Sequence, residues 1–259
     1  MNRFTPITPR LLAAGLGLSL AALTTAPARA QDDGNPDRKW GLILGGRVES
    51  EPTFEGSDEN EIEALPTIIL TYGRLQLGPD LIAVNLLTTD SYYGTIDLSY
   101  DGARDADDLV GFADIDDGLI LGAELGYRSG DARVFLLLDR YFDGAEGTTA
   151  SLGFEYEWDV SRRFSWSAGA SITYADNNYM TGYFGVTPAQ SASSGRAIHD
   201  ASSGFQRVDI NLTARYALTQ NWFVYGELGL GQLLGDAADS PIVQDKTQST
   251  FAFFFGYRF

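Results

Sequence analysis

The sequence predicts an all-β fold, a transmembrane antiparallel β-barrel of about 12 strands whose N- and C-termini both lie in the periplasm. Three observations predict it. The chain opens with an export signal, its segments alternate between apolar and polar residues, and its connections are alternately short and long. A barrel of about ten strands is the alternative, since single-chain bacterial barrels have an even number of strands. The predicted location is the outer membrane of a Gram-negative cell.

The first 30 residues have the three parts of a secretory signal peptide. Arg3 and Arg10 form the positive region, Leu11–Ala26 the apolar region and Ala28–Ala30 an A-x-A cleavage site. Glycines interrupt the apolar region and no stop-transfer charges follow it, which argues against a retained membrane anchor. The sequence therefore predicts a signal peptide over residues 1–30, a periplasmic N-terminal stretch over 31–39 and a barrel over 40–259.

Composition excludes several classes of function. Removing the three signal arginines from 18 basic residues leaves 15 against 35 acidic residues, so the mature chain has a net charge of −20. Such a balance argues against nucleic acid as a partner, because phosphate contacts need Lys and Arg. The chain has no cysteine, which excludes disulfides and thiolate metal sites. Its mean hydropathy of −0.11 does not argue against a membrane protein, because a barrel is apolar on only one face.

The C-terminal segment carries the sharpest pattern. Aromatic side chains occupy every second position, and a strand places such residues on one face: Phe251, Phe253, Phe255, Tyr257 and Phe259. A soluble sandwich could bury such a face. The chain, however, stops on the aromatic residue, in a strand that resembles the terminal recognition signal of outer-membrane barrels. We therefore interpret these five residues as a barrel-assembly signal read by the outer-membrane assembly machinery.

Other segments alternate in the same way and have about the 9–11 residues that a tilted strand needs to cross the membrane. Arg133–Phe142 is ambiguous, because Phe135 and Leu137 share a face with charged residues. Arg74–Leu87 is weak and fits two short strands or one bent strand. The predicted strands lie near residues 40–50, 61–72, 74–78, 80–87, 92–101, 118–128, 131–142, 147–158, 163–175, 205–217, 221–232 and 249–259.

The connections predict the orientation. With a periplasmic N-terminus, one set of connections is short, whereas the outer set includes the long segments Glu51–Asn60, Gly102–Asp117, Asp176–Gly204 and Leu233–Gln248. Barrels have short periplasmic turns and long outer loops. Tryptophan, which prefers the membrane–water boundary, agrees with this orientation. All four tryptophans fall near the predicted periplasmic strand ends: Trp40, Trp158, Trp166 and Trp222.

No catalytic constellation stands out, and we predict neither an enzyme nor a cofactor. The single histidine, His199, lies beside Asp200, Ser202 and Ser203, but neighbours in sequence are no sign of a triad, and an exposed loop histidine is the simpler interpretation. The acidic segment 101–117 does not match a calcium-loop spacing. A solvated acidic loop is the simple interpretation, and weak Ca²⁺ or Mg²⁺ binding beside lipopolysaccharide is the alternative. Outer-membrane lipid and lipopolysaccharide are the surroundings that the fold implies.

Charged residues are predicted on the lumen-facing side of the strands. Those that we single out are Arg47, Glu124, Arg128, Glu155, Arg207, Asp209, Arg215 and Glu227. Charges inside a narrow barrel must pair or stay hydrated. One interpretation is an ion-pair network across the lumen that rigidifies or occludes the barrel, and the other is a charge-selective pore.

Several stretches resemble the MltA-interacting protein/OmpV (MipA/OmpV) family of outer-membrane proteins. They are Tyr183–Thr187 with the serines after it, Leu234–Val243, Phe54–Ser57 with the later Pro66, and the closing Phe251–Phe259 strand. The resemblance implies an outer-membrane protein without known catalytic residues. It also implies a scaffolding role toward two enzymes. One is a murein hydrolase of the lytic transglycosylase type, and the other is a peptidoglycan synthase.

The predicted periplasmic turns offer little area for such a scaffold, because a specific interface buries about 800 Å² on each partner. Gln31–Lys39 is the only sizeable periplasmic addition. The long outer loops could instead fold over the lumen or present a binding surface, with Tyr179, Tyr183 and Phe184 as contacts or as packing against the barrel. We predict a non-enzymatic scaffold or interaction protein, with a small-solute or ion pore as the alternative.

Overall fold

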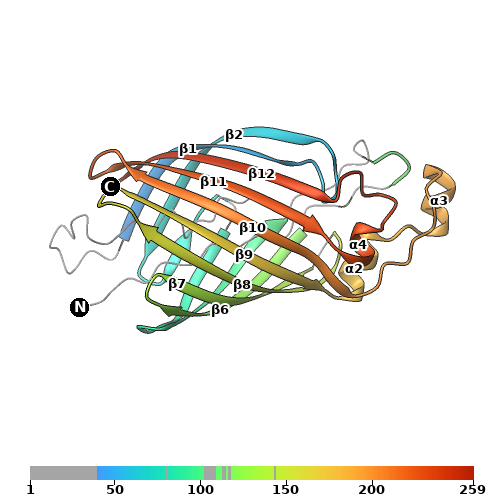
Figure 1. Cartoon of the computed structure of the whole chain (residues 1–259), viewed down its shortest axis with the longest axis horizontal. Coiled ribbons are helices and arrows are strands. Elements are labelled where there is room, and N and C mark those ends of the chain that lie inside the picture. Colours follow the sequence, from blue (N-terminus) through green and yellow to red (C-terminus); the bar gives the residue numbers. More distant parts are fainter. Residues whose placement is uncertain (1–39, 80, 102–108, 113–114, 116–117, 143) are drawn as a thin grey trace.

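The chain forms a closed antiparallel β-barrel of twelve strands in the computed structural model, which describes residues 40–79, 81–101, 109–112, 115, 118–142 and 144–259 (Figure 1). Each strand pairs with its neighbours in sequence, and β1 pairs with β12 to close the ring. The strands are β1 (Trp40–Pro52), β2 (Asn60–Tyr72), β3 (Leu75–Leu77), β4 (Leu81–Thr88), β5 (Tyr92–Asp101), β6 (Gly118–Ser129), β7 (Ala132–Tyr141), β8 (Gly147–Asp159), β9 (Phe164–Ala175), β10 (Gly204–Ala217), β11 (Trp222–Leu233) and β12 (Thr247–Arg258).

The predicted fold and strand count are confirmed, and the ten-strand alternative is wrong. Three short helices interrupt the connections: α2 (Asn177–Phe184), α3 (Pro188–Ser194) and α4 (Gly235–Ala238). The predicted signal peptide and the stretch 31–39 lie outside the described residues. In the part of the chain that is described, no helix is both long enough and apolar enough to span a membrane.

The alternation of β12 shows how the sequence builds the wall. Phe251, Phe253 and Phe255 point outward with about two-fifths of their surface exposed, whereas Ala252 and Phe254 are fully buried. Successive side chains of a strand point to opposite faces, so one face meets lipid and the other the lumen. On the lumen-facing side, the Phe254 ring has room because two glycines lie against it, Gly45 on β1 and Gly256 on β12 itself.

The segment Arg133–Phe142, which was ambiguous in sequence, forms β7 and places apolar side chains on the lumen-facing side. Phe135 and Leu137 are both 1% exposed and share the inner face with Arg133 and Asp139. Phe135 lies directly opposite Gly153 of β8, where an added Cβ would come within 2.2 Å of the phenyl ring. The lumen therefore accepts a large ring because the neighbouring strand offers a glycine.

The barrel wall has its shortest strand pairing between β2 and β3. The weak segment Arg74–Leu87 forms two short strands, and β3 pairs only with residues 70–72 of β2. Among the described strands, residues 60–69 of β2 thus pair on one edge only, with β1. Pro66 lies in this stretch, and proline is tolerated at a strand edge because it has no N–H to donate.

The two ends of the barrel differ in their connections. We name them the loop end, with segments 53–59, 176–203 and 234–246, and the turn end, with turns 73–74, 89–91, 130–131, 160–163 and 218–221. Figure 1 shows all three helices at the loop end and the C-terminus at the opposite end. All four tryptophans lie at the turn end, where Trp158 stacks on Trp166 with ring centroids 4.1 Å apart. Short turns and an aromatic belt place the turn end in the periplasm.

Candidate functional site

The loop end contains a cluster of packed apolar side chains. Asp176 caps α2 by accepting a hydrogen bond from the Tyr179 amide at 2.9 Å, which starts the helix where β9 ends. The helix then buries one face at the barrel mouth. This face joins a cluster whose members come from the three loop-end segments, segments 109–112 and 144–146, and the strand ends: Phe54, Leu109, Phe112, Ile120, Tyr141, Ala145, Ala175, Tyr179, Met180, Tyr183, Phe184, Val186, Ala201, Leu233, Ala237, Ala238 and Ile242.

We call segments 53–59, 176–203 and 234–246 the cap. Two of them are latched together by backbone hydrogen bonds, since the Gly56 carbonyl accepts from the Gln244 amide at 2.7 Å. Gly56 has a φ of +97°, and an added Cβ would lie 2.8 Å from Val243. Only glycine meets both conditions without strain. Ser240 Oγ donates to the Phe184 carbonyl at 2.5 Å, which ties the third segment to the same cluster.

A buried carboxylate lies at the base of the cap. Glu55 accepts hydrogen bonds from Gln206 Nε2 at 2.9 Å to both of its oxygens, and Arg207 Nη1 lies 3.5 Å away. Tyr179 Oη donates to it at 3.4 Å, and Tyr183 Oη accepts from its amide at 3.0 Å. Burial raises the pKa of the Glu55 carboxyl above 4.5, although the Arg207 charge opposes this shift.

A β-bulge supplies the partners of Glu55. The pairing of β9 with β10 shifts register between Phe205 and Arg207, and the extra residue turns inward. Gln206 and Arg207 are therefore both buried, whereas Phe205 points outward. Arg207 also holds Asp209 of its own strand at 2.5 Å.

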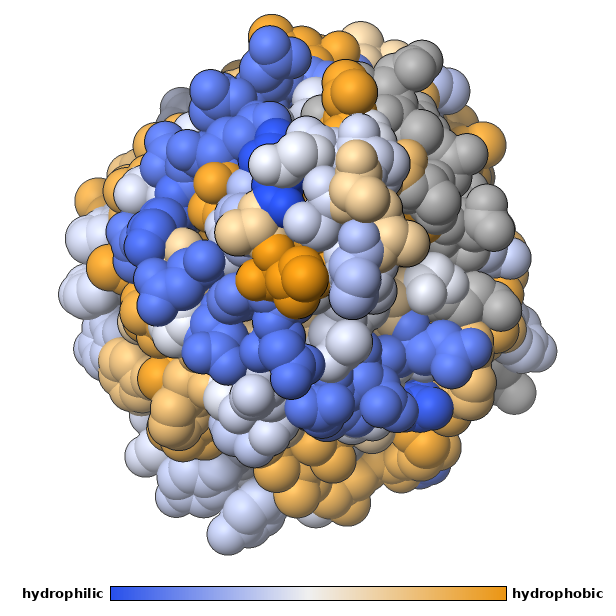
Figure 2. Space-filling model, turned by 90° about the vertical axis from the view of Figure 1, so that its right-hand side faces the viewer, coloured by the Kyte–Doolittle hydropathy of each residue, from blue (hydrophilic) through white to orange (hydrophobic). Residues whose placement is uncertain are grey.

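The loop aromatics predicted as contacts do not form an accessible surface. Tyr179, Tyr183 and Phe184 are at most 3% exposed, and they pack on one another and on Tyr141. Of the two roles considered for them, partner contact is contradicted by this burial, and packing against the barrel's own residues is what the structure has. Figure 2 shows hydrophilic residues over much of the loop end, with a hydrophobic patch near the centre of this face.

The lumen beneath the cap is lined by charged residues that pair along the wall. Arg133 Nη2 lies 3.0 Å from Glu155, and its Nη1 lies 3.7 Å from Glu124. Arg47 lies 3.3 Å from Glu49 on β1. These pairs join residues of one strand or of adjacent strands, so they follow the wall instead of crossing the lumen.

Aromatic side chains complete this lining. Tyr93 Oη donates to Glu124 at 2.7 Å, and the Arg128 guanidinium stacks over the Tyr93 ring at 4.3 Å. Glu227 accepts a hydrogen bond from Tyr225 of the same strand. The structure thus places the eight predicted lumen charges on the inner face. Those whose contacts are given above each have a polar or aromatic neighbour.

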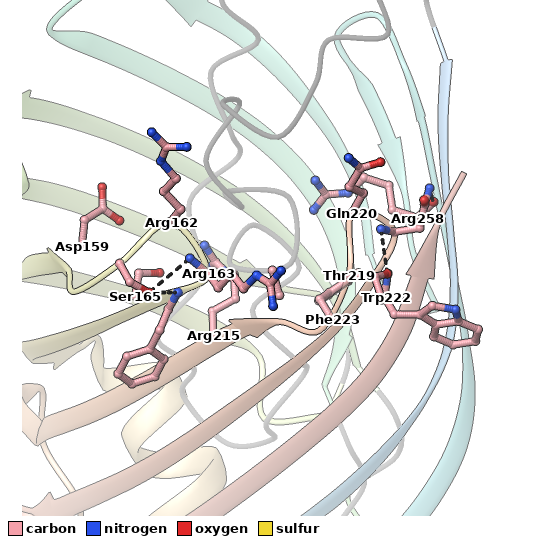
Figure 3. Close-up of a pocket in the computed structure, with 14 residues that line it drawn as sticks. Asp159, Arg162, Arg163, Ser165, Arg215, Thr219, Gln220, Trp222, Phe223 and Arg258 are labelled. Carbon is pink, nitrogen blue, oxygen red and sulfur yellow. Dashed lines mark hydrogen bonds between the residues drawn. The ribbon is translucent and has the colours of Figure 1, made fainter.

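A pocket opens at the turn end between turns 160–163 and 218–221. Figure 3 shows Asp159 and Arg162 on one side, Arg258 on the other, and Arg163 and Arg215 between them. Hydroxyl groups hold both turns, because Ser161 Oγ accepts from backbone amides of residues 163 and 164, and Thr219 Oγ1 from those of residues 221 and 222. Arg215 and Arg258 come from lumen-facing strand positions, and Arg162 and Arg163 come from the turn.

Neither the histidine nor the acidic side chains form a candidate catalytic or metal site among the described residues. His199 Nε2 forms a hydrogen bond with the Asp236 carbonyl at 2.8 Å, and its backbone pairs with Val186, so the ring helps to hold the cap together. No group of three or more His, Asp or Glu side chains in the described ranges could hold a metal ion. The acidic segment 101–117 lies mostly outside those ranges, and its cation binding stays a prediction.

Sequence reasoning missed the residues at the base of the cap, whereas Arg215 of the turn-end pocket was among the predicted lumen charges. Glu55 entered it only as part of a family-like motif, and Gln206 not at all, since strict alternation would turn Gln206 outward. The bulge has no recognisable signal in the sequence. The paired arginines of turn 160–163 were a visible signal, because two adjacent positive charges beside a short turn are uncommon in so acidic a chain.

The family comparison bears on this architecture. The family model described as MltA-interacting protein MipA matches residues 44–259, which is nearly the whole barrel. The chain belongs to the MipA family. The resemblance predicted from the loop motifs and the closing strand is therefore confirmed, and the protein is an outer-membrane barrel.

Relatives and solved structures are more distant. YiaT of Escherichia coli (strain K12), named as an outer membrane protein, is 24% identical over 117 residues, and the match spans 47% of its length and 45% of this chain. The KdgM porin has 11% identity and a TM-score of 0.43, with 84% of this chain and 99% of that chain covered. The NanC porin has 7% identity and a TM-score of 0.41, with coverages of 84% and 98%. Similarity of this extent carries no argument about what this MipA-family barrel does.

Proposed function

We propose that this MipA-family protein is a non-enzymatic interaction protein that is closed toward the outside and acts at its periplasmic end. The cap carries this proposal. Seventeen buried apolar residues from distant segments pack at the loop end, and apolar contacts of this extent are stable because opening them returns the side chains to water. A closed loop end favours a role other than passage of solutes.

The partner that we propose is a periplasmic murein hydrolase. The family description, MltA-interacting protein, supports a partner of this kind. The turns are short, so the docking surface must combine the rim of the turn end with the predicted N-terminal stretch 31–39. A specific interface of about 800 Å² per partner needs both, because single turns of a few residues cannot supply that area.

The alternative is an ion or small-solute pore. Its support is the charged lumen, since Arg133, Glu124 and Glu155 line a polar inner wall of the kind that sets charge preference in channels. The lining and the cap meet at Arg207, which pairs with Asp209 of its own strand and with Glu55 of the cap. A pore would require the cap to open.

The first experiment is single-channel recording of the purified, refolded full chain in planar bilayers. The proposal expects no steady openings, and sustained ion-selective openings would place the pore first. The second experiment measures capture of a purified murein lytic transglycosylase by the same protein in detergent. Capture is expected from the mature chain and is expected to be lost on deleting residues 31–39, whereas replacing α3 at the opposite end should leave it unchanged. Equal capture by the deletion and the mature chain would contradict the proposed surface.

A further inference from the structure

The turn-end pocket gathers positive charge in a strongly acidic protein. Four arginines line it, against a single lining carboxylate from Asp159. The chain has only 18 basic residues against 35 acidic ones, so this concentration at one periplasmic site is not expected from composition. The pocket also has amide groups from Gln220 and Asn221 and an aromatic wall that includes Phe223.

The two inner arginines, Arg215 and Arg258, are held in place and lie close to each other. Arg215 is 7% exposed, and the Arg258 guanidinium lies 5.5 Å over the Phe223 ring, so neither side chain can swing freely into water. The charges of Arg215 and Arg258 repel each other. Glu157 lies 3.9 Å from Arg215, and the carboxylates of Glu155 and Asp159 also act on its charge. An anion between the guanidiniums would relieve this repulsion, and it would do so without the entropy cost of ordering the side chains.

We propose that this pocket binds a carboxylate group of a peptide ligand. Guanidinium groups match carboxylates in a bidentate geometry, and the amides and aromatic wall suit the peptide that carries the carboxylate. The pocket lies between two turns of the turn end, and its inner arginines occupy lumen-facing strand positions, which favours a ligand from the periplasm over the phosphates of the lipid leaflet. This inference deepens the interaction function proposed above, because it names the chemistry by which the periplasmic end recognises a partner.

Calorimetric titration of the refolded full chain tests the pocket without any protein partner. The probe is acetyl-alanyl-glutamate, and its matched control is the same dipeptide with both carboxylates converted to amides. Saturable binding of the acid and none of the amide is the expected result. Binding of both peptides, or of neither, would overturn the proposal. A third titration with inorganic phosphate separates the sources, since phosphate binding as tight as the peptide acid would contradict a peptide-carboxylate site.

Substitutions locate the binding. Arg215→Gln and Arg258→Gln are expected to weaken binding of the acid by about tenfold or more, because each removes a charge-assisted hydrogen bond. Arg163→Gln keeps the test informative if the inner variants misfold, since this side chain is exposed on a turn. The matched control is Arg74→Gln, which removes the same charge from another exposed position at the turn end and is expected to leave the affinity unchanged. Equal losses in Arg74→Gln and the pocket variants would indicate general charge attraction and overturn the site.

The outcomes separate the two proposals. If the pocket variants lose the dipeptide but keep the transglycosylase, the pocket does bind carboxylates but is not what recognises that partner. If the wild type binds the dipeptide and never captures the transglycosylase, the site stands and the proposed function fails. If the wild type captures the transglycosylase and no variant alters dipeptide binding, the carboxylate site is wrong and the interaction function stands.

Discussion

The loop end and the turn end of this barrel share the same strands but differ in how far their side chains are buried. At the loop end, apolar side chains from three segments are withdrawn from water, and the carboxylate of Glu55 is buried among hydrogen-bond donors. At the turn end, connections of a few residues leave Arg162 and Arg163 exposed beside a pocket. One end is therefore stabilised by burial, whereas the other keeps its charges available.

This difference follows from the lengths of the connections at the two ends. The strand wall is common to both ends, and its hydrogen bonds tolerate long or short connections alike. Long connections can bury enough apolar surface to fold as a cap, because burial grows with the number of side chains brought together. Short turns bury little, so what they present is set by the few side chains that they carry.

The largest expected effect comes from removing the main cap segment. Because Gly204 pairs with Ala175, residues 176–203 can be replaced by an Asn-Gly hairpin turn without straining the wall. Planar-bilayer recording should change from no steady openings to a conducting channel. The matched control replaces only Pro188–Ser194 with a short Gly-Ser linker, and it should stay closed because this helix has no buried residues. A silent barrel after the large replacement would show that the cap is not what closes the lumen.

A single cavity in the cap should loosen it without removing it. Phe184→Ala deletes a fully buried ring, and such truncations cost about 3–5 kcal/mol. Hydrogen exchange of the amides in residues 185–203 should accelerate, with the strand amides unchanged. Ile198→Ala is the control in the same segment, since its side chain is 62% exposed. Equal acceleration in both variants would contradict a packed cap.

Two glycines, one at each end, allow the stability of the two ends to be compared with smaller expected losses. Gly73 at the turn end has a φ of +58° and open space around it, so Gly73→Ala should cost only the backbone strain of about 1–2 kcal/mol. Gly56→Ala in the cap should cost more, by about 1–3 kcal/mol, because the new methyl group also meets Val243. Urea-dependent loss of the folded band on unheated gels measures both. A smaller loss for Gly56→Ala would mean that its loop is not packed as described.

The smallest expected effect is a pH dependence confined to the cap. Burial raises the pKa of Glu55 in the closed cap above 4.5, so the closed state binds its proton more readily than the open state. Cap stability should therefore increase as pH falls through the raised pKa toward 4.5 and be constant above it. The groups facing this carboxyl are Arg207, Asp209 and Tyr179.

Limited proteolysis within residues 185–203 measures this effect. Cleavage should be slower near pH 5 than near pH 8 relative to cleavage of an unrelated unfolded substrate by the same protease. Glu55→Gln should remove the difference, because the amide has no proton to gain in this range. A pH dependence that persists in Glu55→Gln would assign it to another group.

Much of the barrel can be read directly from the chain because the information is local. The period-two alternation of β12 places Phe251, Phe253 and Phe255 on one face of the strand, which is the outer face in the barrel. Turn length and the tryptophans orient the barrel for the same reason. Two segments were predicted as strands from weak patterns. In β7, Phe135 turns inward because Gly153 makes room for its ring, and the pattern of Arg74–Leu87 is weak because β3 is only three residues long.

The cap and the pocket depend instead on contacts between residues far apart in the chain. Glu55 meets Tyr183 and Gln206, which follow it by 128 and 151 positions, and a bulge in β10 is needed to turn Gln206 inward. In the same way, the pocket joins the turn after β8 to Arg258 at the last strand. Hydropathy patterns report which face a residue takes, but not which distant loop arrives beside it, because that depends on how the closed ring brings its connections together.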